Sequence, residues 1–209
     1  MTSRRRKGFS RKVGFERTKR FLVIAMEGAV TEPYYFEIFW PHRSSDVQIK
    51  LVNNPNHKSH PKEVLQRLQT CFAKSPYTLK HDQGWLVIDR DAWPEHELRQ
   101  VCADAQKAGF RVALSNPCFE LWLYLHMRDV RAFSGRHDCQ NKLAGVLAGY
   151  QPDKKGGYDE EALRKGVHDA VRRAEHLDTT PDEPVPTEYA TRVYLLMREL
   201  LPHIALPAA

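Results

Sequence analysis

The sequence lacks several features that define common classes of protein. Its 209 residues contain four cysteines, which are scattered and form no C-x-x-C pair, so we expect reduced thiols rather than disulfides or a zinc site. There is no G-x-x-x-x-G-K-[ST] loop, no nucleophile elbow and no H-E-x-x-H motif. No apolar run approaches the roughly 20 residues that a membrane-spanning helix needs. These absences argue against a P-loop ATPase, an α/β-hydrolase, a zinc protease and a membrane protein.

Positive charge is concentrated at the N-terminus. Residues 1–20 hold nine of the 32 Lys and Arg residues, among them Arg4, Arg5, Arg6 and Lys7, whereas the rest of the chain is slightly acidic. Such an arm can neutralise phosphates and attract nucleic acid; the alternative is a solvated leader that only favours solubility. Because the stretch lacks the apolar segment of a secretory signal, we expect a cytoplasmic protein with a flexible basic arm.

From residue 21 onwards, segments typical of strands alternate with segments typical of helices. Expected strands cover residues 21–28, 47–53, 84–91 and 110–117, and expected helices cover residues 31–40, 61–74, 94–109 and 118–127. Thr31 is the expected N-cap of the first helix, and Gly109 is expected to end the third. The alternation predicts a doubly wound, mostly parallel α/β sheet over residues 21–127.

Past residue 128 the pattern predicts helices only, over residues 137–150, 159–177 and 188–200. We expect residues 128–209 to form a helical lobe that packs on the sheet. A glycine-containing turn in this part carries Lys154 and Lys155. These two lysines are candidates for binding a nucleic-acid backbone, although a solvated turn would have the same composition.

Acidic residues fall at the carboxyl ends of the expected strands, where doubly wound sheets bind ligands. Glu27 ends the first strand, and Asp89 and Asp91 end the third, in the segment WLVIDRDA. Two carboxylates about 4 Å apart repel each other by roughly 4 kcal/mol at an effective dielectric constant near 20. Protonation of one acid or a bound cation relieves that repulsion. Hard oxygen ligands suit Mg²⁺ or Mn²⁺, so we expect these three carboxylates to form a metal site for phosphate chemistry.

Two other interpretations of D-R-D remain open from the residues alone. The segment could be a solvated turn in which Arg90 pairs with both aspartates. Alternatively, the first aspartate could be the nucleophile of a phosphatase. That motif belongs after the first strand and usually continues with a small hydroxyl residue, whereas here it follows the third strand and continues A-W-P.

Together, several motifs make the sequence resemble the RloB-like family. The first expected strand ends in Glu27 and Gly28 and continues as E-G-x-x-T-E-P-x-Y-F, a later strand ends in D-x-D, and S-N-P-C-F-E-L-W-L-Y-L-H follows. The resemblance covers residues 21–127, and residues 185–200 are similar to a C-terminal helix of the family. Members are associated with bacterial anti-phage defence and belong to the broader Toprim group of metal-dependent phosphoryl-transfer domains.

The resemblance implies a Toprim-like fold in which Asp89 and Asp91 hold Mg²⁺ and Glu27 acts as general acid/base near the scissile phosphate. Glu27 could equally be a metal ligand. In such a site a metal polarises the phosphoryl oxygens, and a nearby carboxylate moves a proton to or from the bridging oxygen. The resemblance also implies a separate ATPase partner protein that restrains or triggers the enzyme.

Further polar residues have both functional and structural interpretations. Glu120 is a carboxylate in an otherwise apolar helix; it could take part in catalysis at the metal site, or pair with the helix dipole or with Arg90. For Glu32 we favour a role at the helix N-terminus, and for Asn116 the capping of the following helix. His126 is expected to be a core histidine with its hydrogen bonds satisfied.

The leading functional hypothesis is a Mg²⁺-dependent nuclease that acts as a toxic effector in anti-phage defence. RNA is slightly favoured over DNA as its substrate, and the resemblance makes transfer RNA one candidate. A non-catalytic module that binds nucleic acid or a partner protein is the alternative, as is a Toprim-like enzyme acting on a nucleotide or small phosphoester. A homodimer is compatible with the sequence.

Overall fold

The structure is a computed structural model that describes residues 19–42, 44, 46–55, 58–74, 77–90, 93–130, 132–152 and 154–206. The predictions for the basic arm, with Arg4, Arg5, Arg6 and Lys7, and for Asp91 lie outside these residues.

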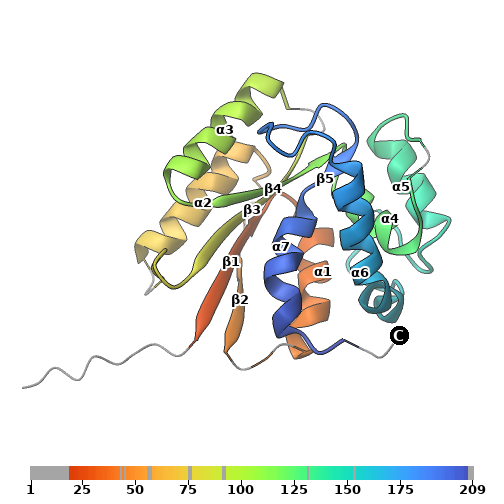
Figure 1. The fold of residues 1–209 in the computed structure, drawn as a ribbon, viewed down its shortest axis with the longest axis horizontal. Helices are drawn as coiled ribbons and strands as arrows, with labels where there is room; N and C mark the ends of the chain where they lie inside the picture. The colour runs from red at the N-terminus through yellow and green to blue at the C-terminus, as the bar shows by residue number, and fades with distance from the viewer. Residues whose placement is uncertain are drawn as a thin grey trace, which may run out of the picture.

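A five-stranded sheet with strand order β2-β1-β3-β4-β5 forms the centre of the molecule (Figure 1). The first four strands are parallel, and β5 pairs with β4 in the antiparallel direction. The strands are β1 (Arg20–Met26), β2 (Val47–Val52), β3 (Gln83–Asp89), β4 (Arg111–Asn116) and β5 (Ala190–Thr191). The predicted mixed α/β fold with a mostly parallel sheet is therefore confirmed.

Helices cover both faces of this sheet (Figure 1). Because successive strand residues point to opposite faces, Leu22 and Ile24 of β1 contribute to one hydrophobic core, whereas Val23 and Ala25 contribute to the other. The first face, which we call face A, packs against α1 (Thr31–Phe39), α4 (Glu120–Met127), α5 (Arg136–Ala144), α6 (Glu160–Leu177) and α7 (Val193–Leu200). The opposite face, face B, packs against α2 (Pro61–Lys74) and α3 (Glu95–Lys107).

Two 3-10 helices, η1 (Trp40–His42) and η2 (Leu201–His203), complete the elements of the described chain. No helix in the described ranges combines the length and apolar character needed to cross a membrane.

The winding of the chain creates a topological switch point between β1 and β3. These strands are neighbours, yet β1 leads into α1 on face A and β3 leads into α3 on face B. The loops that follow the two strands therefore diverge. Open α/β sheets bind their ligands at such a switch point, outside the carboxyl ends of the strands.

The C-terminal part is not purely helical, so that prediction was wrong in one respect. Residues 190 and 191 form β5, where the hydroxyls of Ser115 and Thr191 lie 2.8 Å apart. A two-residue strand leaves no alternation in the sequence, and its pairing with β4 depends on tertiary contacts. The helix predicted from residue 188 accordingly begins at Val193, and the helix predicted over 137–150 ends at Ala144.

The first helix also begins differently from the prediction. Thr31 is its first helical residue, and Val30 occupies the N-cap position without a side-chain hydrogen bond. The expected turn after α3 is present, since Gly109 has φ +77°. All four cysteines are free thiols, as expected.

Candidate functional site

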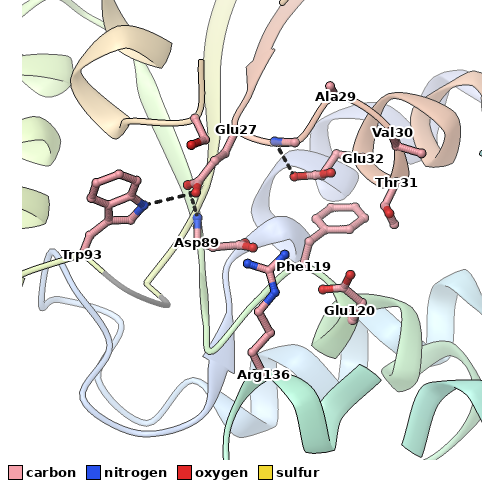
Figure 2. A pocket seen from close by; sticks show the side chains of 12 residues that line it. Glu27, Ala29, Val30, Thr31, Glu32, Asp89, Trp93, Phe119, Glu120 and Arg136 are labelled. Carbon is pink, nitrogen blue, oxygen red and sulfur yellow. Dashed lines mark hydrogen bonds between the residues drawn. The ribbon is translucent and has the colours of Figure 1, made fainter. Parts of the chain in front are cut away.

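The carboxylate of Glu27 is held between two segments at the switch point. Its backbone N–H donates to the Val87 carbonyl at 2.9 Å, which continues the β1–β3 ladder one residue beyond β1. Oε2 accepts from the backbone N–H of Asp89 at 3.1 Å, and Oε1 accepts from Trp93 Nε1 at 3.1 Å (Figure 2). Hydrogen bonds to both oxygens give the carboxylate a fixed orientation beside the end of β3.

A cavity of about 380 Å³ opens next to Glu27 and collects acids from three parts of the sequence. Glu27, Glu32, Asp89 and Glu120 all line it, and Figure 2 shows these side chains around a common space. Asp89, Glu32 and Glu120 are only 5–6% exposed. We call this cavity the acidic pocket.

Burial and mutual repulsion perturb two of these acids. Burial, followed by the charges of Glu32, Glu27 and Glu120, raises the pKa of Asp89 well above its usual range. Burial, with smaller contributions from Glu120 and Glu27, raises the pKa of Glu32 to about 7. Such shifts arise where carboxylates share a poorly hydrated space without enough positive charge. They are also typical of functional sites.

Gly28 allows Glu32 to fold back over the loop that follows β1. Glu32 Oε1 accepts from the Gly28 backbone N–H at 2.8 Å. A Cβ atom at residue 28 would lie 1.9 Å from Glu32 Oε2, so any larger residue would displace this carboxylate. The E-G pair therefore has a steric explanation, and Glu32 does more than complement the helix dipole.

Glu120 reaches the pocket as the first residue of α4. Its Oε1 accepts from Tyr150 Oη at 3.0 Å and from Gln140 Nε2 at 3.2 Å. Both donors belong to the C-terminal part of the chain, beyond the four parallel strands. That part therefore positions one of the predicted site residues, and Glu120 does not pair with Arg90.

Arg136, the first residue of α5, is the one basic residue among the described residues that line the acidic pocket. Its guanidinium points toward Asp89 and Glu120 (Figure 2). Its charge opposes the rise in the pKa of Asp89, although it is a smaller influence than burial and the surrounding acids. One guanidinium against four carboxylates leaves the pocket with an excess of acidic groups.

The other interpretation of D-R-D, in which Arg90 pairs with the aspartates, is wrong for Asp89. Arg90 instead contacts Glu95 at 3.3 Å and donates to the carbonyls of Pro186 and Thr187 at 2.9 and 3.0 Å. Asn116 likewise donates to carbonyls of residues 186–188, the shortest contact being 2.8 Å to Glu188. Both side chains anchor the C-terminal chain, and neither has the predicted local role.

The histidines near the site have structural contacts. His126 is buried, with Nδ1 2.9 Å from the Trp122 carbonyl and Nε2 3.2 Å from Tyr35 Oη, and burial lowers its pKa to about 4. It is therefore the core histidine that the sequence predicts. His60 packs on the ring of Trp93 and contacts Glu97 at 3.2 Å, so it supports the indole that holds Glu27.

The predicted nucleic-acid residues of the C-terminal turn lie outside the acidic pocket. Lys154 is exposed, and Lys155 forms an exposed ion pair with Glu37 at 3.3 Å. Lys155 also lines a hollow of about 340 Å³ that shares Gly28 and Ala29 with the acidic pocket.

The donor set suits a hard divalent cation, although the described residues do not form a complete site. Within the parts of the chain that the structure describes, no three His, Cys, Asp or Glu side chains form a group that could hold a metal ion. Asp91 lies outside them. Four carboxylates nevertheless line the pocket, and the raised pKa values of Glu32 and Asp89 show that their charged forms are disfavoured there. A bound Mg²⁺ or Mn²⁺ would stabilise these charged forms.

Sequence patterns do not identify three residues of the pocket. The sequence favours a role at the helix N-terminus for Glu32, and no pattern in it points to Trp93 or Arg136. The T-E-P segment after the E-G pair was a usable signal for Glu32. Arg136 has no comparable signal, because its place in the pocket depends on how α5 packs against α4.

One comparison with known proteins identifies a relationship. A family model described as RloB-like protein matches residues 22–200, which includes the C-terminal helices as well as the parallel strands. Searches of curated proteins and of solved structures found no significant match.

Proposed function

Because the chain belongs to the RloB-like protein family, we propose that it is a divalent-metal-dependent nuclease of the Toprim type. We also propose RNA as the preferred substrate, a role as effector in anti-phage defence, and control by a separate ATPase. The observation that carries the proposal is the convergence of four carboxylates at the switch point between β1 and β3.

The proposed roles follow from the contacts of each side chain. Asp89 and Asp91 are the proposed ligands of Mg²⁺ or Mn²⁺, which when bound would stabilise charge that develops on the phosphate. Glu27, which Trp93 and the Asp89 backbone orient, is the proposed proton-holding group or a further metal ligand. Glu120 is the second carboxylate available for proton transfer, oriented by Tyr150. Arg136, the one basic residue among the described residues that line the pocket, is the proposed partner of a phosphate oxygen of the substrate.

A nucleotide or other small phosphoester is the second candidate substrate. The acidic pocket has a volume of about 380 Å³. Small-molecule sites typically range from roughly 300 to 1,000 Å³, so the pocket is large enough for a mononucleotide.

The decisive experiment incubates purified protein with RNA, DNA and nucleotide pools in Mg²⁺, in Mn²⁺ and in EDTA. We expect metal-dependent cleavage of RNA, and we expect Asp89→Asn and Glu27→Gln each to reduce its rate by roughly a hundredfold or more. Asp104→Asn is the matched control, because this half-exposed carboxylate lies on α3 outside the pocket.

The outcomes separate the candidates. Wild-type rates in both pocket variants would refute the assignment of the site. Turnover of nucleotides without cleavage of polymers would favour the small phosphoester. Binding of nucleic acid without any metal-dependent cleavage, together with no thermal stabilisation by Mg²⁺ or Mn²⁺, would identify a non-catalytic binding module.

A further inference from the structure

A second hollow, of about 600 Å³, runs along α2 and the edge strand β2. Four basic residues line it, Lys50, Lys58, Arg67 and Lys74, and the one acidic residue among its described lining residues is Glu63. Glu63 already pairs with Lys58 at 2.6 Å. We call this hollow the basic groove. Its excess of positive charge matches an anionic ligand.

The groove follows one face of a single helix. Its α2 residues recur every three or four positions: Glu63, Gln66, Arg67, Thr70, Cys71 and Lys74. The intervening residues Val64, Leu65 and Leu68 are buried in the core of face B. At 1.5 Å per residue this face extends over roughly 17 Å, a length that can accompany more than one phosphate of a single strand.

Arg67 has unused hydrogen-bonding capacity beside the groove. Its Nη2 donates to the Met26 carbonyl at 2.7 Å, at the end of β1, immediately before Glu27. Its Nε and Nη1 are buried, and no group among the described residues accepts from them. Buried donors normally have partners, and a guanidinium has the geometry to bind phosphate oxygens.

A chain of shared residues connects the basic groove to the acidic pocket. The hollow beside Lys155 shares Asn53 and Asn54 with the groove, and it shares Gly28 and Ala29 with the pocket. Asn54 also joins the two regions directly. It donates to the Lys58 carbonyl at 3.0 Å and to the Glu27 carbonyl at 3.4 Å.

We propose that the basic groove binds the phosphate backbone of a nucleic-acid strand and leads it past Lys155 into the acidic pocket. That the path ends at a catalytic site rests on the proposed nuclease function, whereas binding of the strand in the groove needs no catalysis. Lysine and asparagine side chains are frequent partners of backbone phosphates. Lys50 has a competing explanation, because lysines on edge strands such as β2 discourage pairing with other strands.

The test measures binding of a short labelled RNA by fluorescence anisotropy, in EDTA, with the full-length chain. Lys50→Glu/Lys74→Glu reverses two exposed charges of the groove. Lys165→Glu/Arg172→Glu makes the same change in charge on α6, which covers the other face of the sheet (Figure 1). We expect the groove variant to bind on the order of tenfold more weakly and to lose roughly 0.7 per lysine from the slope of log K against log salt. The α6 variant is expected to keep both values near those of the wild type.

Lysine acetylation followed by mass spectrometry then locates the bound strand on the wild-type protein. RNA is expected to protect Lys50, Lys74 and Lys155 and to leave Lys165 reactive. Unchanged affinity of the groove variant, or an equal loss in both variants, would overturn the proposal, as would protection confined to the N-terminal arm. These measurements use EDTA, so they do not depend on nuclease activity. If the groove binds RNA but the protein cleaves no RNA in Mg²⁺ or Mn²⁺, the proposed function is refuted and the proposal for the groove stands. A DNA strand of the same sequence shows whether the groove distinguishes the two polymers.

Discussion

At the scale of single residues, burial and mutual repulsion make it unfavourable for the acids of the acidic pocket to be charged. Glu32 is 6% exposed and is surrounded by Glu27, Asp89 and Glu120. Its pKa of about 7 lies above the ordinary value of 4.5. As pH rises, the unfolded chain therefore releases this proton at a lower pH than the folded protein does. A group of this kind stabilises the fold below the unfolded pKa, and that stability is lost as pH rises through the folded pKa.

We therefore expect the free energy of unfolding in EDTA to fall between about pH 4.5 and 7, by up to roughly 3 kcal/mol from Glu32. Glu32→Gln keeps an oxygen that accepts from Gly28 but removes the charge. Urea unfolding should find this variant roughly 1–3 kcal/mol more stable than the wild type at pH 8, and similar to it at pH 4. Glu37→Gln on the same helix, a 45%-exposed carboxylate, is the control and should show little difference. A Glu32→Gln variant no more stable than the wild type at pH 8 would contradict the electrostatic account.

The part of the pocket that could be predicted follows from strand ends. Glu27 and Asp89 terminate apolar runs, and parallel strands bring such ends to one edge of the sheet. Glu32 and Glu120 were visible as acids in unusual positions, but their direction depends on the Gly28 loop and on Tyr150. Trp93 and Arg136 enter the pocket through tertiary packing alone, which no local pattern reports.

At the scale of elements, α6 packs closely against the C-terminal end of α4, the helix that begins at Glu120. Gly166 of α6 faces the backbone of α4, where a Cβ atom would lie 2.5 Å from the His126 carbonyl oxygen. Arg173 adds a hydrogen bond from α6 to the Leu125 carbonyl at 2.7 Å. The sequence predicted both helices, but nothing in their spacing identified Gly166 as the contact point.

Gly166→Ala is accordingly expected to destabilise the protein. In an exposed helix the same change would stabilise by about 1 kcal/mol through helix propensity. Here the backbone clash should outweigh that gain and leave a net loss of roughly 1–3 kcal/mol in urea unfolding. Gly145→Ala is the matched control, because its added Cβ would meet its nearest neighbour at 3.5 Å, an ordinary contact, and stability should change little. Equal effects of the two substitutions would show that α4 and α6 can move apart without cost.

At the scale of the whole molecule, the C-terminal chain belongs to the same cores as the parallel strands. The core of face A extends in sequence from Leu22 to Ile204. Between α6 and β5 the chain crosses to the other side, where Val185 is buried in the core of face B. Residues 178–187 form a proline-rich loop between these two elements. Carbonyls of this loop accept hydrogen bonds from Arg90, Asn116 and Arg192, three residues that are distant from one another in the sequence.

Arg192 provides the most direct test of this connection. Its guanidinium is buried and pairs with Asp178 at 3.0 Å, and it also donates to the Pro184 carbonyl at 3.2 Å. Arg192→Met would leave the Asp178 carboxylate buried without its counter-charge, which we expect to cost roughly 3–5 kcal/mol in urea unfolding. Asp178→Leu/Arg192→Met removes both charges and should recover part of that loss, giving a favourable coupling energy in a double-mutant cycle. If the loss of stability in the double variant equals the sum of the two single losses, Asp178 and Arg192 do not stabilise the fold as a pair. The stability that Arg192 contributes would then come from its hydrogen bonds to backbone carbonyls such as that of Pro184.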